Sequence, residues 1–227
     1  MAKINIAIDG LSGCGKSSTA KAVAKALGYK FIDTGAMYRS VTLYMLDNEV
    51  DLASKVSIEK ALQSIKIDFQ HNVETGKNET FLNKQNVEKE IRSMRVASAV
   101  SQVAAIKEVR VAMVQQQQEM GKNKGVVMDG RDIGSVVFPN AELKVFMTAS
   151  TEVRAKRRQM ELAEKGEKVE LSEIMKNLEE RDQIDSSRAE SPLVKVEDAV
   201  EIDTSHLKFD EQVQKVLHLA HQRIEAK

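Results

Sequence analysis

A glycine-rich loop near the start of the chain constrains the fold more than any other feature. Residues 10–17 have the sequence Gly-Leu-Ser-Gly-Cys-Gly-Lys-Ser and satisfy the pattern G-x-x-x-x-G-K-[ST]. The β-branched run Ile4–Ile8 precedes this loop and predicts a buried strand. Apolar residues recur at helical spacing from Lys16 to Leu27, and Gly28 is a residue type at which helices end. The order strand, loop, helix is typical of a phosphate-binding loop (P-loop).

The residue types of the loop suit a bound phosphate. Glycines let successive backbone N–H groups point at one anion, and the N-terminus of the following helix adds partial positive charge. We expect Lys16 to contact the outer phosphates of a nucleotide and Ser17 to ligate Mg²⁺. The alternative is a tight glycine turn with an incidental lysine, and the flanking strand and helix argue against it.

The rest of the chain predicts an α/β fold. Further strands are predicted at residues 29–33, 125–128, 143–147 and 200–202, with helical segments between them, including 151–164 and 172–187. Alternation of this kind is typical of a parallel sheet with helices on both faces. A helical pattern also runs from about Ser93 to Met120, and the glutamines at 115–118 within it indicate a solvated helix face.

The pattern changes between about residues 65 and 95. Ile67 and Phe69 alternate with polar residues, and Glu74–Lys77 has the composition of a turn. This segment predicts a small antiparallel insert within a single domain that spans residues 1–227.

Composition excludes several classes of protein. The 34 basic and 34 acidic residues give a net charge of +0, whereas a protein that binds nucleic-acid phosphates usually has a basic excess. One cysteine cannot form an intrachain disulfide, and no apolar run suits a signal peptide or a membrane span. His218 and His221 lie three apart on a predicted helix without a pattern of further metal ligands. We expect a cytoplasmic protein without nucleic-acid or membrane partners.

Arginines are few and follow predicted strands. The chain has 11 arginines against 23 lysines, and a planar guanidinium suits bidentate recognition of phosphate. Ligands of parallel sheets bind at the carboxyl ends of the strands, so we expect Thr34, Arg39, Arg131 and Asp132 near the P-loop, as a second anionic subsite.

Two further groups of arginines lie in the predicted charged helices. Arg181 and Arg188 bracket Asp185. Arg154, Arg157 and Arg158 lie close together at the start of a helix, where ordinary surface ion pairing is an equal alternative.

Five ordered motifs resemble the bacterial cytidylate kinases, also called CMP kinases, and together they cover nearly the whole chain. They are residues 6–10 running into the P-loop, Asp33–Arg39, Ala97–Ala105, Asp129–Asp132, and Glu180–Asp182 with Asp185 and Arg188. The family pattern often has serine where Thr34 stands and proline where Leu11 stands. Neither change removes a needed group.

The resemblance implies a P-loop nucleoside monophosphate kinase that transfers the γ-phosphoryl group of ATP to CMP or dCMP. It implies a P-loop NTPase-type parallel sheet flanked by helices, with a monophosphate-binding insert at about 65–95 and a helical lid at about 154–169. It also implies a Mg²⁺ cofactor at Ser17, and we expect a monomer. The implied ATP-binding residues are Gly10, Leu11, Ser12, Gly13, Cys14, Gly15, Lys16, Ser17 and Ser18.

The resemblance also implies roles in binding CMP and in catalysis. It assigns the cytosine edge to Ser101, Arg110 and Asp132, the acceptor phosphate to Arg39, Arg131 and Arg188, and the sugar to Arg181 and Asp185, with Thr34 completing the CMP-binding set. The implied catalytic group is Lys16, Arg131, Asp132, Arg154, Arg157 and Arg158.

The chemistry of the substrates agrees with these roles. Cytosine presents an amine donor beside two acceptors, which a carboxylate and an arginine such as Asp132 and Arg110 complement, and uracil would reverse that demand. The second pKa of a phosphate monoester is about 6, so the attacking oxygen needs no strong general base. Catalysis then rests on alignment and on cations around the migrating group, with a closing lid that excludes water.

Three other functions fit a P-loop. A related kinase could act on another monophosphate or on shikimate, but the Asp129–Asp132 segment and the insert argue against it. A GTPase switch would carry an Asn-Lys-x-Asp segment, which the sequence lacks. A non-catalytic nucleotide-binding module is the third, and turnover with ATP and a panel of acceptors distinguishes them all.

Overall fold

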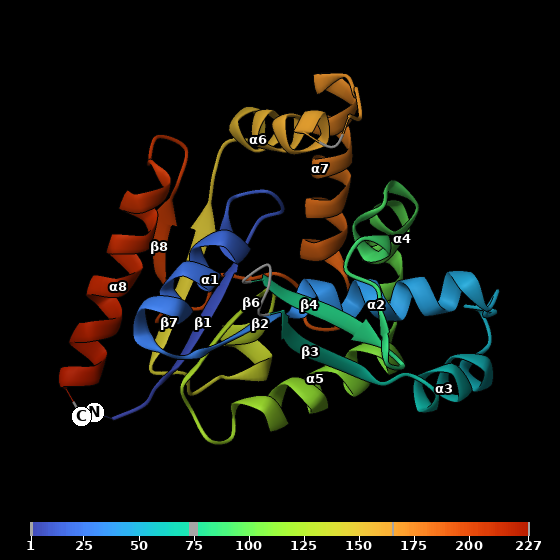
Figure 1. Ribbon diagram of the computed structural model, residues 1–227, viewed down its shortest axis with the longest axis horizontal. Coiled ribbons are helices and arrows are strands. Elements are labelled where there is room, and N and C mark those ends of the chain that lie inside the picture. Colours follow the sequence, from blue (N-terminus) through green and yellow to red (C-terminus); the bar gives the residue numbers. More distant parts are fainter. Residues whose placement is uncertain (1, 73–76, 165, 227) are drawn as a thin grey trace. The chain divides into compact units, whose positions relative to one another are not determined.

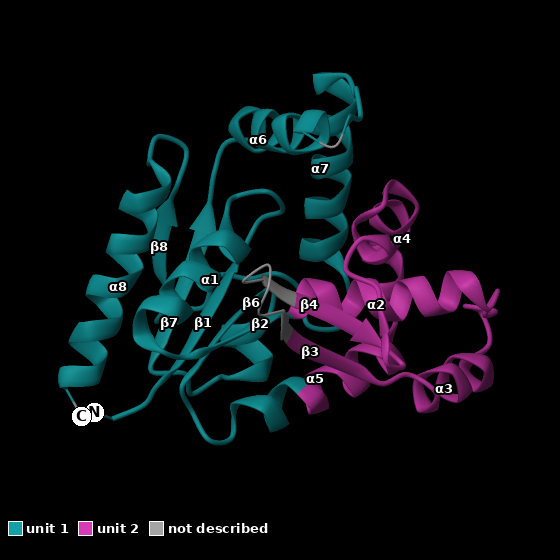
Figure 2. Ribbon diagram, in the orientation of Figure 1, with its two compact units in different colours: residues 1–33, 117–227 teal, residues 34–116 magenta. Residues whose placement is uncertain are grey.

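A computed structural model describes residues 2–72, 77–164 and 166–226 (Figure 1). The chain forms two compact units, one of residues 1–33 with 117–227 and the other of residues 34–116 (Figure 2). Residues 74–76 of the predicted turn lie outside the described residues. Within the described ranges, no helix has the length and the apolar character that crossing a bilayer requires.

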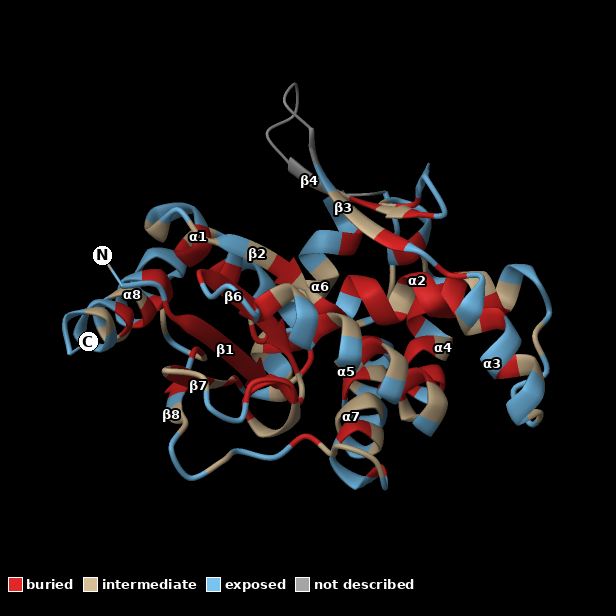
Figure 3. Ribbon diagram, turned by 90° about the horizontal axis from the view of Figure 1, so that it is seen from below, coloured by how far each residue is buried: buried red, intermediate tan, exposed pale blue. Residues whose placement is uncertain are grey.

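The first unit contains a five-stranded parallel sheet. Its strands are β1 (Asn5–Gly10), β2 (Lys30–Asp33), β6 (Val126–Gly130), β7 (Leu143–Thr148) and β8 (Val200–Asp203), in the spatial order β2-β6-β1-β7-β8. The central strand β1 pairs with β6 on one side and β7 on the other, and Ile8 lies opposite Asp129 and Val145. The predicted parallel sheet is therefore confirmed, and Figure 3 shows β1 buried along its length.

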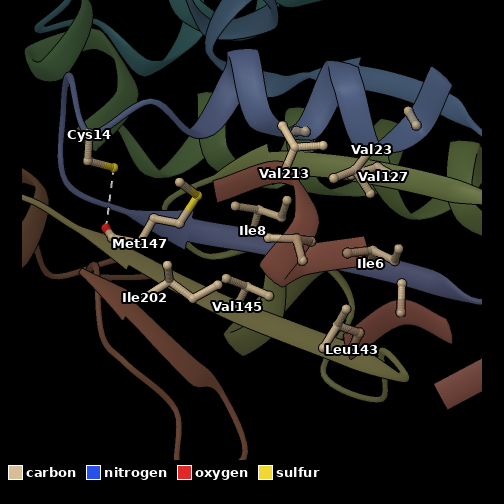
Figure 4. Packing of buried hydrophobic residues seen from close by; sticks show 14 of the residues in the cluster. Ile6, Ile8, Cys14, Val23, Val127, Leu143, Val145, Met147, Ile202 and Val213 are labelled. Carbon is tan, nitrogen blue, oxygen red and sulfur yellow. Dashed lines mark hydrogen bonds between the residues drawn. The ribbon is translucent and has the colours of Figure 1, made fainter. Parts of the chain in front are cut away.

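One face of the sheet carries the main apolar core. Ile6 and Ile8 of β1 pack with Val23 of α1 (Lys16–Leu27) and with Val213 of α8 (Phe209–Glu225), as Figure 4 shows. Burying a side chain of this size contributes about 1.5–3 kcal/mol. The core thereby fixes α1, and with it the end of the P-loop, against the sheet.

The opposite face of β1 carries polar groups. Asn5 donates through Nδ2 to the carbonyl oxygen of Gly121 at 2.9 Å, at the end of α5 (Lys107–Gly121). Asp9 accepts hydrogen bonds from a one-turn π-helix, η2 (Ile133–Val137). Helical segments therefore lie on both faces of the sheet, as predicted.

Two long helices of the first unit have a small core of their own. They are α6 (Thr151–Glu164) and α7 (Leu171–Ser187). Ala155 and Leu162 of α6 pack with Ile174 and Leu178 of α7. The predicted lid segment, about 154–169, runs from α6 toward the start of α7.

The second unit combines helices with a small antiparallel sheet. It contains α2 (Thr34–Asp47), α3 (Lys55–Gln63), β3 (Ile67–Asn72), β4 (Lys77–Leu82), β5 (Gln85–Asn86), η1 (Glu90–Arg92), α4 (Met94–Ala105) and most of α5. Strands β3, β4 and β5 pair antiparallel in chain order, and Ile67 lies opposite Leu82. The predicted antiparallel insert is confirmed.

The helical pattern from Ser93 to Met120 proves to be two helices. Ile106 is extended, with φ −69° and ψ 126°, and separates α4 from α5. No glycine or proline marks the break. Arg110 instead donates through Nη1 to the carbonyl oxygen of Ala104 at 3.1 Å, which satisfies a group that a continuing helix would have used.

The glutamine run also differs from its prediction at one residue. Gln117 is fully buried, whereas Gln115 and Gln118 are exposed. Gln117 lies one helical turn after the buried Met113, so the helical period places it on the inner face.

Candidate functional site

The P-loop is bound tightly to the end of β7. Leu11 N and Cys14 Sγ both donate to the carbonyl oxygen of Met147, each at 3.3 Å. Figure 4 shows the bond from Cys14. A Cβ at Gly10 would lie 1.9 Å from that oxygen, so only glycine fits there. Gly15 has φ +93°, a left-handed conformation that glycine adopts without strain. The loop and the helix N-terminus are thereby arranged as the sequence predicted.

Lys16 lies inside the loop. Its side chain is buried, and Nζ donates to the carbonyl oxygen of Leu11 at 2.5 Å. Burial, reinforced by the nearby positive charge of Arg131, lowers the pKa of Lys16. An ammonium group held in this way gains from any anion brought beside it.

Ser17 contacts an acid at the end of β6. Its hydroxyl donates to Asp129 Oδ2 at 2.6 Å. Burial raises the pKa of Asp129 to about 7, and the neighbouring charge of Asp33 adds to the rise, while Ser17 and Lys16 oppose it. A buried carboxylate in this position gains from a bound cation.

The two oxygens suit Mg²⁺. This hard cation prefers oxygen ligands, keeps several waters and binds through one or two protein groups together with substrate phosphates. Nowhere in the described ranges do three or more His, Cys, Asp or Glu side chains gather to hold a metal. Ser17 and Asp129 are thus a partial oxygen set that a nucleotide would complete.

Ser12 connects the loop to three separate parts of the first unit. Its Oγ accepts from Arg131 Nη2 at 2.6 Å, and its carbonyl oxygen accepts from Arg154 Nη1 at 3.1 Å. Its backbone N–H donates to Asp182 Oδ1 at 3.2 Å, and Asp182 Oδ2 pairs with Arg154 Nη1 at 2.5 Å. All three polar groups of Ser12 are therefore held by residues from β6 onward.

Arg131 and Arg188 share an acid of α7. Arg131 Nε lies 2.7 Å from Asp185 Oδ2, and Arg188 Nη1 lies 3.7 Å from Asp185 Oδ1. Arg188 Nη2 also lies 3.8 Å from Asp132 Oδ1. Burial alone would raise the pKa of Asp185, but the arginines beside it, Arg131 foremost, hold that pKa below its usual range. The structure therefore brings these four predicted residues together beside the P-loop.

Arg181 adds another cation to this group. Burial and the positive charge of Arg131 lower its pKa to about 10, and Arg158 contributes in the same direction. Arg158 itself pairs with Glu161 of its own helix at 3.1 Å. Cations assembled against their mutual repulsion are typical of a site for a multiply charged anion.

Arg154 and Arg157 both support the P-loop. Arg154 is buried and also donates to the carbonyl oxygen of Ala149 at 3.0 Å. Arg157 donates through Nη2 to the carbonyl oxygen of Thr204 at 2.7 Å, and Thr204 Oγ1 donates to that of Cys14 at 2.9 Å. Surface ion pairing, the alternative left open by the sequence, does not describe these two arginines.

Four predicted residues belong to the second unit. Arg110 is buried, and its guanidinium carbon lies 5.2 Å from the ring centroid of Tyr38. Ser101 is buried in α4, and Thr34 is buried at the start of α2. Arg39 donates through Nη1 to the carbonyl oxygen of Ile91 at 3.3 Å. Arg110 thus contacts the end of α4 and Tyr38 of α2 within the second unit.

Sequence reasoning missed several residues that shape the site. Asp9 bonds the segment that directly follows Asp132, whereas Asp129, Asp182 and Thr204 contact P-loop residues, and none of the four was predicted as a site residue. A signal existed for the first two, because an ionisable residue that ends an apolar strand faces the ligand-binding edge of a parallel sheet. Thr204 directly follows β8 and so lies at the same edge, whereas Asp182 lies within α7 without such a signal.

Comparisons with known proteins identify the family of this chain. The family model described as cytidylate kinase matches residues 6–222. A cytidylate kinase of Flavobacterium psychrophilum is 57% identical over 96% of this chain and 98% of its own length. One of Cytophaga hutchinsonii is 53% identical over 97% of this chain and 94% of its own length.

A solved structure shows the fold alone. An uncharacterized protein from Eubacterium ventriosum matches over 100% of both chains with a TM-score of 0.50 and 11% identity. The family model and the two bacterial relatives, in contrast, match by sequence along nearly the whole chain, which therefore belongs to the cytidylate kinase family.

Proposed function

We propose that this protein transfers the γ-phosphoryl group of ATP to CMP or dCMP and forms CDP or dCDP. The observation that carries the proposal is the position of Arg131. Its guanidinium bonds the P-loop through Ser12 Oγ and the acid Asp185 of α7. One side chain thereby links the loop that would hold the donor phosphates to Asp185, the acid that Arg131 shares with Arg188.

The proposed donor site is the P-loop. The residues Gly10 to Ser18 hold the phosphates of ATP, and Lys16 neutralises charge that develops on the migrating group. Arg131, Arg157 and Arg158 add positive charge around it, and Arg154 acts through the loop, because its guanidinium bonds Ser12, Ala149 and Asp182. When bound, Mg²⁺ would be held through Ser17 and Asp129 and would screen the phosphate charges.

The proposed acceptor site has one subsite for each part of CMP. Arg39, Arg131 and Arg188 bind the phosphate, Arg181 and Asp185 the sugar, and Ser101, Arg110 and Asp132 the cytosine, with Thr34 beside them. Asp132 accepts from the exocyclic amine, and Arg110 donates to the ring acceptors. The segment 65–95 serves as the monophosphate-binding insert and 154–169 as the lid within one kinase domain.

The remaining expectations concern the protein in the cell. A single cysteine suits a reducing compartment, so we propose a cytoplasmic enzyme. We also propose that it is a monomer and binds no nucleic acid. Light scattering at several concentrations tests the first of these two points, and a gel-shift assay tests the second.

Turnover with a panel of acceptors tests the proposed function. The protein is incubated with Mg²⁺-ATP and each of CMP, dCMP, UMP, AMP and shikimate, and ADP is measured. We expect ADP with CMP and dCMP, and much less with the other acceptors. Preference for shikimate or AMP would contradict the proposal, and GTP hydrolysis without an acceptor would indicate a switch instead.

A further inference from the structure

A buried carboxylate connects the start of the P-loop to the segment that follows Arg131 and Asp132. Asp9 is the last acidic residue before the loop, on the central strand β1. Its Oδ1 accepts from the backbone N–H of Ile133 at 2.8 Å, and its Oδ2 accepts from that of Gly134 at 2.7 Å. Both carboxylate oxygens therefore bond one short segment, which lies more than 120 positions after Asp9 in the chain.

The segment fits the carboxylate closely. A Cβ at Gly134 would lie 3.3 Å from Asp9 Oδ2 and 3.2 Å from Lys144 Cδ. These contacts are tighter than an added carbon normally makes, so a side chain at position 134 would require Asp9 or Lys144 to shift by a few tenths of an ångström. The carboxylate and Gly134 form one fitted contact, made by two parts of the chain.

We propose that Asp9 is a positioning residue for the acceptor nucleotide. It fixes the backbone of Ile133 and Gly134, and through it the two residues immediately before them, Arg131 and Asp132. The carboxylate bonds backbone N–H groups of the adjoining segment, so its effect on Arg131 and Asp132 passes through the backbone. This inference rests on the proposed function, in which Arg131 and Asp132 bind CMP.

Charge supports this role at neutral pH. Burial raises the pKa of Asp9 to about 6, against the two hydrogen bonds that lower it, and Asp132 adds to the rise while Lys16 opposes it. Above this pKa both oxygens of Asp9 are acceptors, as two facing N–H donors require. An asparagine side chain in the same place has only one acceptor oxygen, which can accept from one of the two backbone N–H groups. Its NH₂ group would face the other N–H, so that two donors would meet.

The variant Asp9→Asn therefore tests the proposal at pH 7.5. We expect the KM for CMP to rise about tenfold, the loss expected for a charged hydrogen bond, and the KM for ATP to change less than about threefold. Binding of CMP alone, measured by calorimetry, weakens by the same factor. Asn5→Ala is the matched control, because Asn5 lies on the same strand and face and bonds Gly121 at the other end.

Other outcomes overturn the proposal. An unchanged CMP affinity in folded Asp9→Asn would do so, and so would equal losses for ATP and CMP, which would place the effect at Lys16 and the donor loop. If Asp9→Asn does not fold, Gly134→Ala is measured instead. This variant keeps the carboxylate of Asp9 but displaces the backbone N–H group that it bonds. We expect the same selective loss of affinity for CMP. Wild-type protein that turns over no CMP would instead refute the proposed function, so the two failures are distinguishable.

Discussion

Several side chains of the site carry charges that their surroundings disfavour and that a bound nucleotide would stabilise. Lys16 is buried with a lowered pKa, Asp129 is buried with a pKa raised to about 7, and the half-buried Arg181 has a pKa lowered to about 10. Each of these pKa shifts shows that the charged form of the group is disfavoured. Anionic phosphates and a cation at Asp129 would offset these costs, so the energy is recovered when substrates bind.

The first prediction concerns Lys16. Its removal takes away the buried cation closest to the loop interior, so Lys16→Ala should reduce kcat for CMP by about 10³-fold or more. The measurement is ADP formation in a coupled assay. Lys21→Ala is the control, an exposed lysine on the same helix. Turnover near that of the wild type would remove Lys16 from the mechanism.

The second prediction concerns Asp132. Loss of its carboxylate removes the acceptor proposed for the cytosine amine, so Asp132→Ala should raise the KM for CMP about 10–100-fold. Affinity for ATP, measured by titration of a fluorescent analogue, should change little. Asp210→Ala, at an exposed acid of α8, should leave both constants unchanged. Equal defects for ATP and CMP in a folded Asp132→Ala protein would contradict the assignment.

Among the secondary-structure elements, α6 and α7 do more than frame a lid. Arg154 of α6 and Asp182 of α7 form a pair at 2.5 Å, and each bonds Ser12 of the P-loop. Their small apolar core joins the two helices to each other. The base of the predicted lid is therefore part of the support of the P-loop, and movement would be restricted to the segment beyond Arg154.

The third prediction contrasts this pair with one on the surface of α6. Asp182→Ala leaves Arg154 buried without its main counter-charge, which should lower the free energy of unfolding by about 3–5 kcal/mol. Glu152 pairs with Lys156 at 2.5 Å, but both side chains are more than half exposed. Glu152→Ala should therefore leave the stability unchanged. Urea denaturation measures both variants, and similar losses would contradict the role given to Asp182.

The molecule as a whole should respond to pH through Asp9. Its pKa is raised by burial from 3.8 to about 6, so between these values the folded chain holds a proton that the unfolded chain has lost. The contribution of Asp9 to stability is therefore fully present below about pH 4 and is lost as the pH rises through 6.

The fourth prediction follows from this linkage. The free energy of unfolding of the wild type relative to Asp9→Asn should fall between pH 4.5 and 6.5, with a slope that approaches at most about 1.4 kcal/mol per pH unit. Urea denaturation at several pH values measures the slope. Parallel pH profiles for the two proteins would show that Asp9 does not titrate in this range. Asp132 and Lys16, which face Asp9, are present in both proteins, so their own contributions to the pH dependence cancel when the two free energies of unfolding are subtracted.

Patterns that are local in sequence could be predicted because local geometry causes them. The P-loop, the strands of the parallel sheet and the antiparallel insert each follow from residue type and period. The grouping of Arg131 and Asp132 with the P-loop followed from one further rule, that parallel strands end at the same edge of the sheet.

Contacts between distant segments could not be predicted in this way, because a side chain does not encode which remote backbone group it will meet. The bonds of Asp9 to Ile133 and Gly134, and of Asp182 to Ser12, exist only once the sheet has assembled. The break at Ile106 involves residues only six positions apart, but it was not predicted because no glycine or proline marks it; the Arg110 side chain satisfies the carbonyl of Ala104. The sequence by itself determined the fold class and the phosphate loop, whereas tertiary structure decided which buried charges hold that loop in place.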